Sequence, residues 1–148
     1  MTIIAWDGHT LAADKRCSGG ACTFTVRKIH RLADGSLIGL SGDSAYCAQM
    51  LAWVQAGEKA ADIPATQRDR DKFAAAMVIR PNGEVWKYED TPHPYRVEDK
   101  VFAIGSGRDF ALAAMDLGLN SVRAVEVACA RDQNCGNGID TLRLEPAT

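Results

Sequence analysis

Three tight turns between β-branched and apolar segments are the sequence feature that most constrains this fold. They are Asp7-Gly8 between residues 2–6 and 10–16, Asp34-Gly35 between a segment ending at Leu32 and residues 36–41, and Pro81-Asn82-Gly83 between residues 74–80 and 84–88. A short loop of the Asp-Gly or Asn-Gly type suits the twist of two antiparallel strands, so each turn predicts a β-hairpin. Residues 23–26 alternate as a half-buried strand does, after a Gly-rich loop at residues 17–21. Four strands are therefore expected as a meander near the chain start.

Helical periodicity replaces this alternation after the fourth strand. Apolar residues recur on one helical face between Ser44 and Ala56, which predicts a helix that Asp43 or Ser44 caps and Gly57 ends. The other expected elements are a loop or short helix at 58–72, an irregular crossing at 91–94, short strands at 101–104 and 139–144, and helices at 108–117 and 121–130.

Antiparallel hairpins with helices grouped between them favour an α+β fold over alternating parallel βαβ units. Two antiparallel sheets between two helix layers would bury the strand faces and the apolar helix faces together. The chain has 148 residues, of which 47% are hydrophobic. A chain of this size and composition can bury one core, so we expect a single domain over residues 1–148.

Composition and charge exclude several functions. Seventeen Lys plus Arg oppose nineteen Asp plus Glu, and the net charge of −2 suits neither nucleic acid nor an anionic membrane. No apolar run approaches the roughly 18 residues of a membrane span, and no secretory signal is recognisable. Five cysteines without a Cys-x-x-Cys motif argue against a disulfide framework or a zinc site. We therefore expect a cytoplasmic protein in which Cys47 and Cys129 are buried helix residues.

Three places in the sequence could carry chemistry. Thr2 leads directly into a strand, so removal of Met1 would leave a threonine whose free α-amine is held by a sheet. Asp14 interrupts an apolar strand, and Lys28 lies at the end of another. Gly105-Ser106-Gly107 joins a strand to a helix, and its glycines permit close backbone approach.

Each of these places also has an ordinary structural interpretation. Small residues at position 2 are common and usually without consequence. Asp14 and Lys28 could form an ion pair at a sheet end or lie in solvent as separate charges. Ser106 could be the N-cap of the helix that follows it.

Taken together, the three places indicate nucleophilic catalysis. A threonine hydroxyl is a weak nucleophile and needs a base, which the α-amine of Thr2 can supply directly or through one water. The reference pKa of an α-amine is about 7.7–8.0. A nearby Lys28 ammonium would lower that pKa by repulsion, and Asp14 would keep the lysine charged. Gly42 lies between a strand and a helix, where unpaired backbone N–H groups can stabilise an oxyanion.

These motifs resemble, as an ordered set, those of the proteasome β-subunits, and in size and style they are nearer to the bacterial HslV-type peptidases and their small bacterial and phage-borne homologues. They are Thr2-Ile3-Ile4-Ala5, Leu11-Ala12-Ala13-Asp14-Lys15-Arg16, Val26-Arg27-Lys28-Ile29, Gly42 and Ile104-Gly105-Ser106-Gly107. The resemblance runs nearly end to end. It implies an N-terminal nucleophile (Ntn) hydrolase fold, which is a four-layer αββα sandwich.

The resemblance also implies a role for each matching residue. Thr2 would be the nucleophile and its amine the proton acceptor, with Asp14 and Lys28 as the family's acid–lysine pair. Arg16 would be a supporting arginine and Gly42 the oxyanion donor. Ser106 would be the serine that steadies the amine, with Asp132 as the hydrogen-bonding neighbour of Ser106. A small, mostly apolar substrate pocket would be lined by Cys17, Val26, Leu40 and Ser44. Such a pocket favours a neutral side chain before the scissile bond. Cys135 stands where the family usually has a serine.

The expected function is that of a threonine endopeptidase, with its sites inside stacked homo-oligomeric rings and no metal or organic cofactor. Its substrates would be peptides or unfolded proteins, and an ATP-dependent unfoldase is the partner such a ring would use. Residues 57–72 are too few for the family's long second helix. Two alternatives remain: an amidohydrolase of the same superfamily acting on a small amide, and a non-catalytic ring or scaffold subunit that retains Met1.

Overall fold

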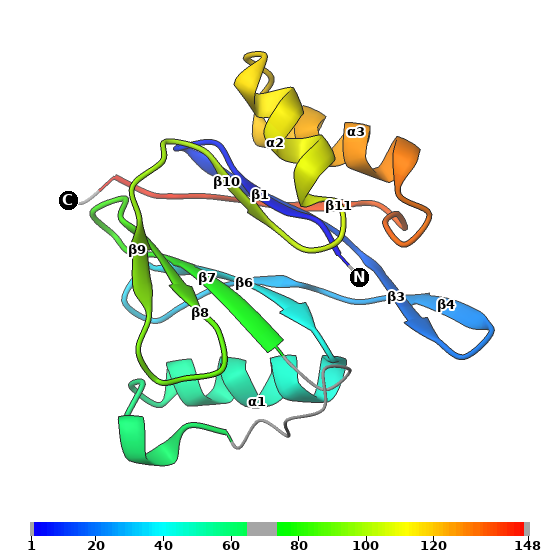
Figure 1. Cartoon of the computed structure of the whole chain (residues 1–148). Coiled ribbons are helices and arrows are strands. Elements are labelled where there is room, and N and C mark those ends of the chain that lie inside the picture. Colours follow the sequence, from blue (N-terminus) through cyan, green and yellow to red (C-terminus); the bar gives the residue numbers. More distant parts are fainter. Residues whose placement is uncertain (1, 65–73, 147–148) are drawn as a thin grey trace.

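The structure, a computed structural model, describes residues 2–64 and 74–146 (Figure 1). Its elements are β1 (Ile4–Trp6), β2 (Thr10–Asp14), β3 (Arg16–Gly19), β4 (Cys22–Thr25), β5 (Ile29–Arg31), β6 (Leu37–Gly42), α1 (Ser44–Gln55), β7 (Ala74–Ile79), β8 (Val85–Tyr88), β9 (Tyr95–Val97), β10 (Phe102–Ile104), α2 (Arg108–Asp116), α3 (Ser121–Arg131) and β11 (Ile139–Arg143). A short 3₁₀ helix at Ala60–Asp62 follows α1.

Two antiparallel sheets form the centre of the molecule. One has the strand order β10-β1-β2-β11 and the other the order β5-β6-β7-β8-β9. Helices α2 and α3 cover the outer face of the first sheet, and α1 covers the outer face of the second (Figure 1). The expected α+β fold, a four-layer αββα sandwich, is therefore confirmed.

Alternation along the N-terminal segment builds two of the core layers. Ile4 and Trp6 are buried between the sheets, whereas Ile3 and Ala5 pack against α2 and α3. Gly39 on β6 allows the sheets to approach closely, because a Cβ atom there would lie 2.6 Å from Cγ2 of Ile4. The second residue of the chain is therefore followed by a strand that is buried on both faces.

Helix α1 confirms the helix expected between residues 44 and 56. The Asp43 carboxylate caps it by accepting hydrogen bonds from the amides of Ala45 and Tyr46, so Asp43 rather than Ser44 is the cap. Met50, Trp53 and Val54 bury its inner face against the five-stranded sheet. The cap also fixes where the helix starts relative to Gly42.

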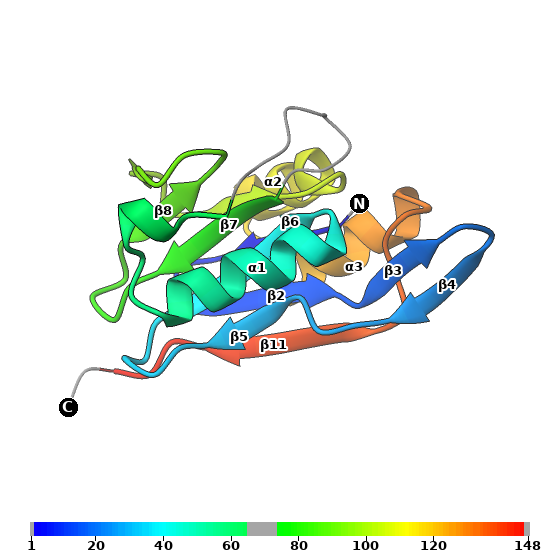
Figure 2. The ribbon, with the colours of Figure 1, turned by 90° about the horizontal axis from the view of Figure 1, so that it is seen from below.

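The segment after Asp14 differs from the expectation. The predicted loop at residues 17–21 is wrong, because Cys17, Ser18 and Gly19 belong to β3 and pair with β4. The strand predicted as half-buried is exposed at all four positions of β4. Strands β3 and β4 form a separate hairpin that projects from the body of the molecule (Figure 2), so neither face meets a second layer.

Other differences concern short elements. Six strands rather than four precede α1, and they are divided among three sheets instead of forming one meander. Strand β9 was not expected, because its three residues follow an irregular segment that contains Pro92 and Pro94. Of the loop or short helix predicted at 58–72, residues 65–72 lie outside the described residues. Neither Cys47 nor Cys129 is fully buried, in contrast to the expectation.

Candidate active site

Thr2 lies at the start of the N-terminal segment and is almost completely buried, with an exposed fraction of 4%. Its backbone nitrogen donates a hydrogen bond to Oγ of Ser106 over 3.1 Å. That hydroxyl donates in turn to Oδ2 of Asp132 over 2.6 Å. The bond from Ser106 is the largest factor that holds the pKa of Asp132 below its ordinary value. A chain of hydrogen bonds thus connects the Thr2 nitrogen to a carboxylate.

The turn that carries Ser106 approaches the backbone of Thr2 closely. Gly105 has a φ of +102°, and a Cβ atom at this position would overlap the carbonyl of Thr2. The amide of Gly107 donates to that same carbonyl over 3.1 Å. Ser106 is therefore not the N-cap that its position allows: Gly107 occupies the cap position of α2 without a side-chain bond. The serine hydroxyl is directed to Thr2 and Asp132 instead.

Asp14 and Lys28 form an ion pair that is screened from solvent. Nζ of Lys28 lies 2.9 Å from Oδ1 of Asp14, and the side chains are 7% and 0% exposed. The carboxylate also accepts from the backbone amides of Ile3, Arg16 and Gly136. The alternative of two separate solvated charges is therefore wrong. These four donors hold the carboxylate, and through it the lysine, at the end of β2.

The side chain of Arg16 binds the loop after α3, and its backbone amide donates to Asp14 of the ion pair. Its Nη1 donates to the carbonyl of Gln133 over 2.7 Å, and its Nε donates to Oδ1 of Asn137 over 3.1 Å. A Cβ atom on Gly136 would lie 2.6 Å from the Arg16 guanidinium, so a side chain there would have to displace the arginine from these bonds. The arginine thus positions the same loop that supplies Asp132.

A cavity of about 650 Å³ opens beside these groups. Thr2, Lys28 and Gly42 line it, together with all four residues predicted for a substrate pocket: Cys17, Val26, Leu40 and Ser44. Gly42 has a φ of +128°, which suits glycine at this junction of β6 and α1. Asp14, Ser106 and Asp132 do not line the cavity; they lie behind Thr2 and Lys28.

The lining surface of the cavity is mostly apolar, as predicted, but polar and charged residues also contribute to it. Residues that the sequence did not single out for it are Ser18, Arg27, His30, Asp43, Cys47, Ala48 and Leu51, and Arg16 also lines it. Burial and the neighbouring Arg27 charge lower the pKa of His30. Burial and the Asp43 carboxylate raise the pKa of Cys47 to about 11. The alternation of β5 and the helical spacing of α1 could have placed His30 and Cys47 on this side.

The loop after α3 makes long-range contacts that no spacing in the sequence indicates. The amide of Gly136 reaches Asp14 across a separation of 122 residues, and Asn137 bonds to both Arg16 and the carbonyl of Phe24. Cys135 is buried, and its thiol donates to Oδ2 of Asp132 over 3.4 Å. Burial, followed by the charges of Asp14 and Asp132, raises the pKa of Cys135 to about 12. It therefore acts as a weak hydrogen-bond donor in place of a serine.

Two antiparallel sheets between helix layers form an αββα sandwich, and Thr2 precedes its first strand. No protein-family profile matches the chain. The sequence is 28% identical to proteasome subunit beta 2 of Pyrococcus abyssi (strain GE5 / Orsay), over an alignment of 173 residues that covers 96% of this chain and 84% of that protein.

Solved structures share the fold over nearly the whole chain. Thiobacillus denitrificans BPH has a TM-score of 0.70 and 20% identity, with 99% of both chains covered. BPH in complex with epoxomicin also gives a TM-score of 0.70, with 19% identity and coverage of 99% and 100%. Eukaryotic HslV from Trypanosoma brucei has a TM-score of 0.71 and 20% identity, with 97% of this chain and 98% of that chain covered. The resemblance to proteasome β-subunits and HslV-type peptidases is thus confirmed.

Residues 2–64 and 74–146 were compared with the requirements of a membrane-spanning helix and of a metal site. Within these ranges no helix is long and apolar enough to cross a membrane. In the same ranges no group of three or more His, Cys, Asp or Glu side chains is placed to hold a metal ion.

Proposed function

We propose that this protein is a threonine peptidase whose nucleophile is Thr2 after removal of Met1. One observation carries the proposal: the nitrogen of Thr2 donates to Ser106, whose hydroxyl donates in turn to Asp132, while Thr2 lines a cavity together with Lys28. A threonine nucleophile needs a base within hydrogen-bond reach, and a trimmed chain supplies one in its own α-amine.

The first step is attack by the Thr2 hydroxyl on a peptide carbonyl. The α-amine accepts the hydroxyl proton and later passes it to the amine leaving group, and a threonine ester with the acyl half of the substrate remains. A water molecule, activated by the same amine, then hydrolyses that ester. Each step moves a proton to or from one nitrogen, whose position Ser106 fixes.

The surrounding residues tune the amine, position other groups, stabilise the oxyanion or receive the substrate. Lys28 borders the cavity as a buried cation and favours the neutral form of a nearby amine by like-charge repulsion. Asp14 holds the lysine, and Arg16 holds the loop that carries Asp132. Gly42 supplies a backbone N–H to the oxyanion that develops on the substrate carbonyl. The walls of the cavity receive the side chain that precedes the scissile bond.

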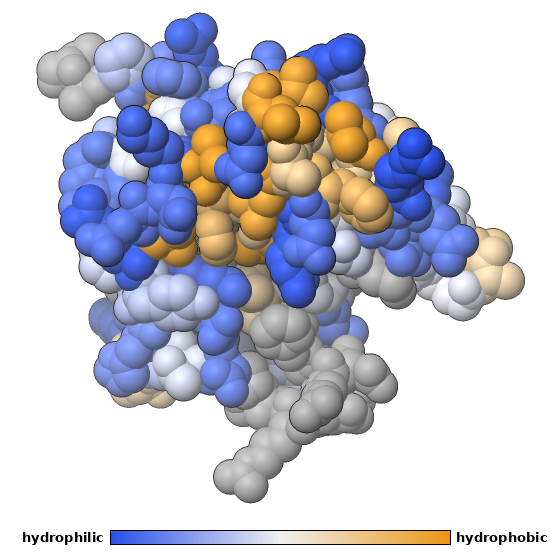
Figure 3. Space-filling model, turned by 45° about the horizontal axis from the view of Figure 1, so that its top comes forward, coloured by the Kyte–Doolittle hydropathy of each residue, from blue (hydrophilic) through white to orange (hydrophobic). Residues whose placement is uncertain are grey.

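Oligomerisation is the second part of the proposal. Apolar side chains gather on the outer surface of the layer formed by α2 and α3 (Figure 3). Four large apolar residues on or next to these helices are exposed: Phe110, Leu117, Leu119 and Val127. Exposed apolar patches of this kind mark protein contacts. We propose stacked homo-oligomeric rings of single-domain subunits in the cytoplasm, enclosing the sites and acting on peptides or on chains delivered by an ATP-dependent unfoldase.

The test begins with the intact mass of untagged protein, because a retained Met1 leaves no free threonine amine. Trimmed protein is then given unstructured polypeptide, short fluorogenic peptide amides and small non-peptide amides, and its native mass is measured. Turnover of the peptides by a large ring supports the proposal. Turnover of small amides alone by a small assembly indicates the amidohydrolase, and a ring with retained Met1 and no turnover indicates the scaffold subunit.

Epoxomicin, the ligand in the BPH complex, gives a second measurement that needs no substrate. We expect the trimmed protein to bind it, Thr2→Ser to bind it more slowly and Thr2→Ala not to bind it. Thr141→Ala is the matched control, since Thr141 is an exposed threonine on β11 away from the cavity. Equal binding by Thr2→Ala would remove Thr2 from the role of nucleophile.

A further inference from the structure

His30 lines the candidate substrate cavity, and the proposed peptidase mechanism does not use it. The cavity lies between α1 and the strands β5 and β6. Its α1 wall is one helical face, made of Ser44, Cys47, Ala48 and Leu51. The opposite wall includes Lys28, His30, Leu40 and Gly42. The cavity therefore extends along β6 from its last residue, Gly42.

The position of His30 is at the end of the cavity away from Gly42. In the antiparallel pairing of β5 with β6, His30 lies opposite Ile38, and the amide of Leu40 donates to the carbonyl of Lys28. Ile38 and Leu40 pack with residues of α1, and opposed residues of an antiparallel pair point to one face, so Lys28 and His30 face α1 as well. Gly42 and Ile38 are about 13 Å apart along the strand. A substrate carbonyl held at Gly42 would direct a long side chain toward His30.

The imidazole of His30 can form hydrogen bonds with such a side chain. His30 is half-buried, and in the described part of the chain neither ring nitrogen has a hydrogen-bond partner. Burial and the Arg27 charge lower the pKa of His30, against the Asp140 charge, which raises it. The neutral imidazole is therefore favoured at neutral pH, and it offers one donor and one acceptor.

Net charge does not decide which side chain the cavity accepts, because its lining holds charges of both signs. Arg16, Arg27 and Lys28 oppose Asp43. The Asp43 carboxylate accepts from two amides of α1, and Lys28 is paired with Asp14. Hydrogen bonding at the imidazole is the feature that can discriminate between substrate side chains of similar size.

We propose that His30 is a specificity-determining residue whose imidazole selects a long side chain with an amide head, such as glutamine, on the amino-terminal side of the scissile bond. This inference rests on the proposed function, because it names the substrates of that peptidase. The imidazole donates to the amide oxygen and accepts from the amide nitrogen. A methionine side chain of similar length leaves these polar atoms unpaired, and a site built for hydrogen bonds discriminates against such an analogue.

The experiment compares three peptide amides that differ only in Met, Gln or Glu before the scissile bond. With Met1-trimmed protein near neutral pH, we expect kcat/KM to favour Gln over Met by about threefold to tenfold, which corresponds to one net hydrogen bond. His30→Leu should reverse this preference, since the rest of the lining is mostly apolar. His30→Asn keeps a donor and an acceptor and should retain it. His93→Asn, at an exposed histidine outside the cavity, is the matched control and should behave as wild type.

A pH series gives a readout that a merely structural role of His30 would not change. Between about pH 7.5 and about pH 5 a glutamate side chain stays mostly ionised, whereas the imidazole gains a proton and becomes a donor only. The ratio of kcat/KM for Glu to that for Gln should therefore rise by at least about threefold as pH falls. Titration of the Thr2 amine cancels in this ratio, because both peptides meet the same amine.

His30→Asn is the control for the other groups that act on this ratio. They are Arg16, Cys17, Arg27, Lys28, Asp43 and Cys47 in the cavity, and Asp140 on β11. The variant retains all of them, so any pH dependence that remains in it is theirs and is subtracted. An equal pH dependence in wild type and His30→Asn would overturn the contact between the imidazole and the substrate.

The outcomes separate the inference from the proposed function. If trimmed protein hydrolyses none of the three peptides, both are contradicted. If it hydrolyses them without a preference for Gln over Met, or if that preference persists in folded His30→Leu, the inference is overturned and the proposed function stands. Should His30→Leu not fold, the wild-type preference and the pH series in His30→Asn still decide the question.

Discussion

The Asp14–Lys28 and Glu58–Arg80 ion pairs differ in their exposure and in their surroundings. The Asp14–Lys28 pair is nearly inaccessible, and its lysine borders the cavity beside Thr2. The Glu58–Arg80 pair is bidentate, with N···O distances of 3.1 and 2.9 Å, and the Tyr88 hydroxyl donates to the same carboxylate over 2.7 Å. Neither Glu58 nor Arg80 lines the cavity.

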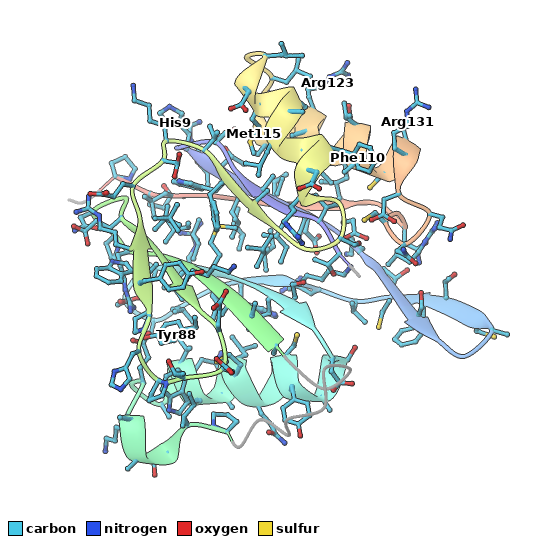
Figure 4. All side chains as sticks on the ribbon, in the orientation of Figure 1. His9, Tyr88, Phe110, Met115, Arg123 and Arg131 are labelled. Carbon is cyan, nitrogen blue, oxygen red and sulfur yellow. The ribbon has the colours of Figure 1, made fainter. Side chains whose placement is uncertain are left out.

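The Glu58–Arg80 pair forms a hydrogen-bond network with Tyr88. Glu58 follows α1 with a φ of +61°, and its carboxylate ties that end of the helix to β7 and β8. Tyr88 lies on the sheet face next to α1, far from the labelled α2 residue Phe110 (Figure 4). Burial, the Glu58 hydrogen bond and the Glu58 charge raise the pKa of Tyr88 beyond its usual range. A buried or half-buried charge alone thus does not mark a site; what distinguishes Lys28 is its position at the wall of the cavity that Thr2 also lines.

The largest effect is expected from Thr2→Ala. Removal of the hydroxyl leaves no nucleophile, so peptide turnover should fall by at least about 10⁴-fold, as it does when other nucleophiles that act in a unit are removed. The free energy of unfolding should change little, because the hydrogen bond to Ser106 comes from the backbone nitrogen. Turnover is measured with a peptide amide and stability by urea denaturation. Wild-type turnover in this variant would contradict the assignment.

Lys28→Ala should have the next largest effect, and it affects both activity and stability. It leaves the Asp14 carboxylate buried without its cation, which costs about 3–5 kcal/mol of unfolding free energy. We expect turnover at neutral pH to fall too, because more of the Thr2 amine is protonated, but by less than the about 10²–10⁴-fold that a positioned proton acceptor itself contributes.

The pH profile separates a catalytic effect of Lys28 from a purely structural one. The amine of trimmed Thr2 would lose a neighbouring positive charge, so its pKa rises and the acid limb of turnover moves to higher pH. Asp14, Asp132 and Ser106 are the other polar groups near it and are unchanged. Lys28→Arg keeps the charge and should retain the wild-type limb. An unshifted limb in folded Lys28→Ala would mean that the pair is structural, like Glu58–Arg80.

Ser106→Ala should have a smaller effect on turnover, about tenfold, because it removes one positioning hydrogen bond of about 1.5 kcal/mol. The pKa of Asp132 should rise toward its ordinary value, since the bond from Ser106 is the main factor lowering it. A carboxylate with a lowered folded pKa stabilises the fold above its unfolded pKa, and this contribution disappears as pH falls through the folded pKa. In the variant that contribution is smaller, and acid unfolding begins at higher pH. Ser106→Thr is the control that keeps the hydroxyl.

Local patterns predicted much of this molecule because the deciding interactions are local. The turn at Asp7-Gly8, the cap at Asp43 and the spacing of α1 depend on residues within a few positions of each other. The same holds for Thr2 at the start of a buried strand. These features place Thr2, the proposed nucleophile, and the strand ends that carry Asp14 and Lys28.

Contacts between distant segments could not be predicted in this way. The amide of Gly136 meets Asp14 only after the sheet and α3 have formed, and no spacing in the sequence indicates that contact. From the residues alone Ser106 had the position of a helix cap, and only the family resemblance indicated its contact with Thr2; the close approach at Gly105 is what directs its hydroxyl there. Likewise, the small residues from Cys17 to Gly19 have the composition of a loop, and only pairing with β4 makes them a strand.

Glu58→Gln should leave turnover unchanged and affect stability alone, which makes it the sharpest contrast with Lys28→Ala. The neutral amide keeps the size of the side chain and an acceptor for Tyr88, but it loses the charge-assisted bonds to Arg80. Hydrogen bonds to charged groups contribute about 1.5–3 kcal/mol, and partial exposure of both side chains places the loss toward the lower end. The measurement is urea denaturation beside peptide turnover, with Glu89→Gln as the control at an exposed ion pair. Reduced turnover in folded Glu58→Gln would show that the end of α1 and the cavity are coupled, and the distinction between the two pairs would no longer hold.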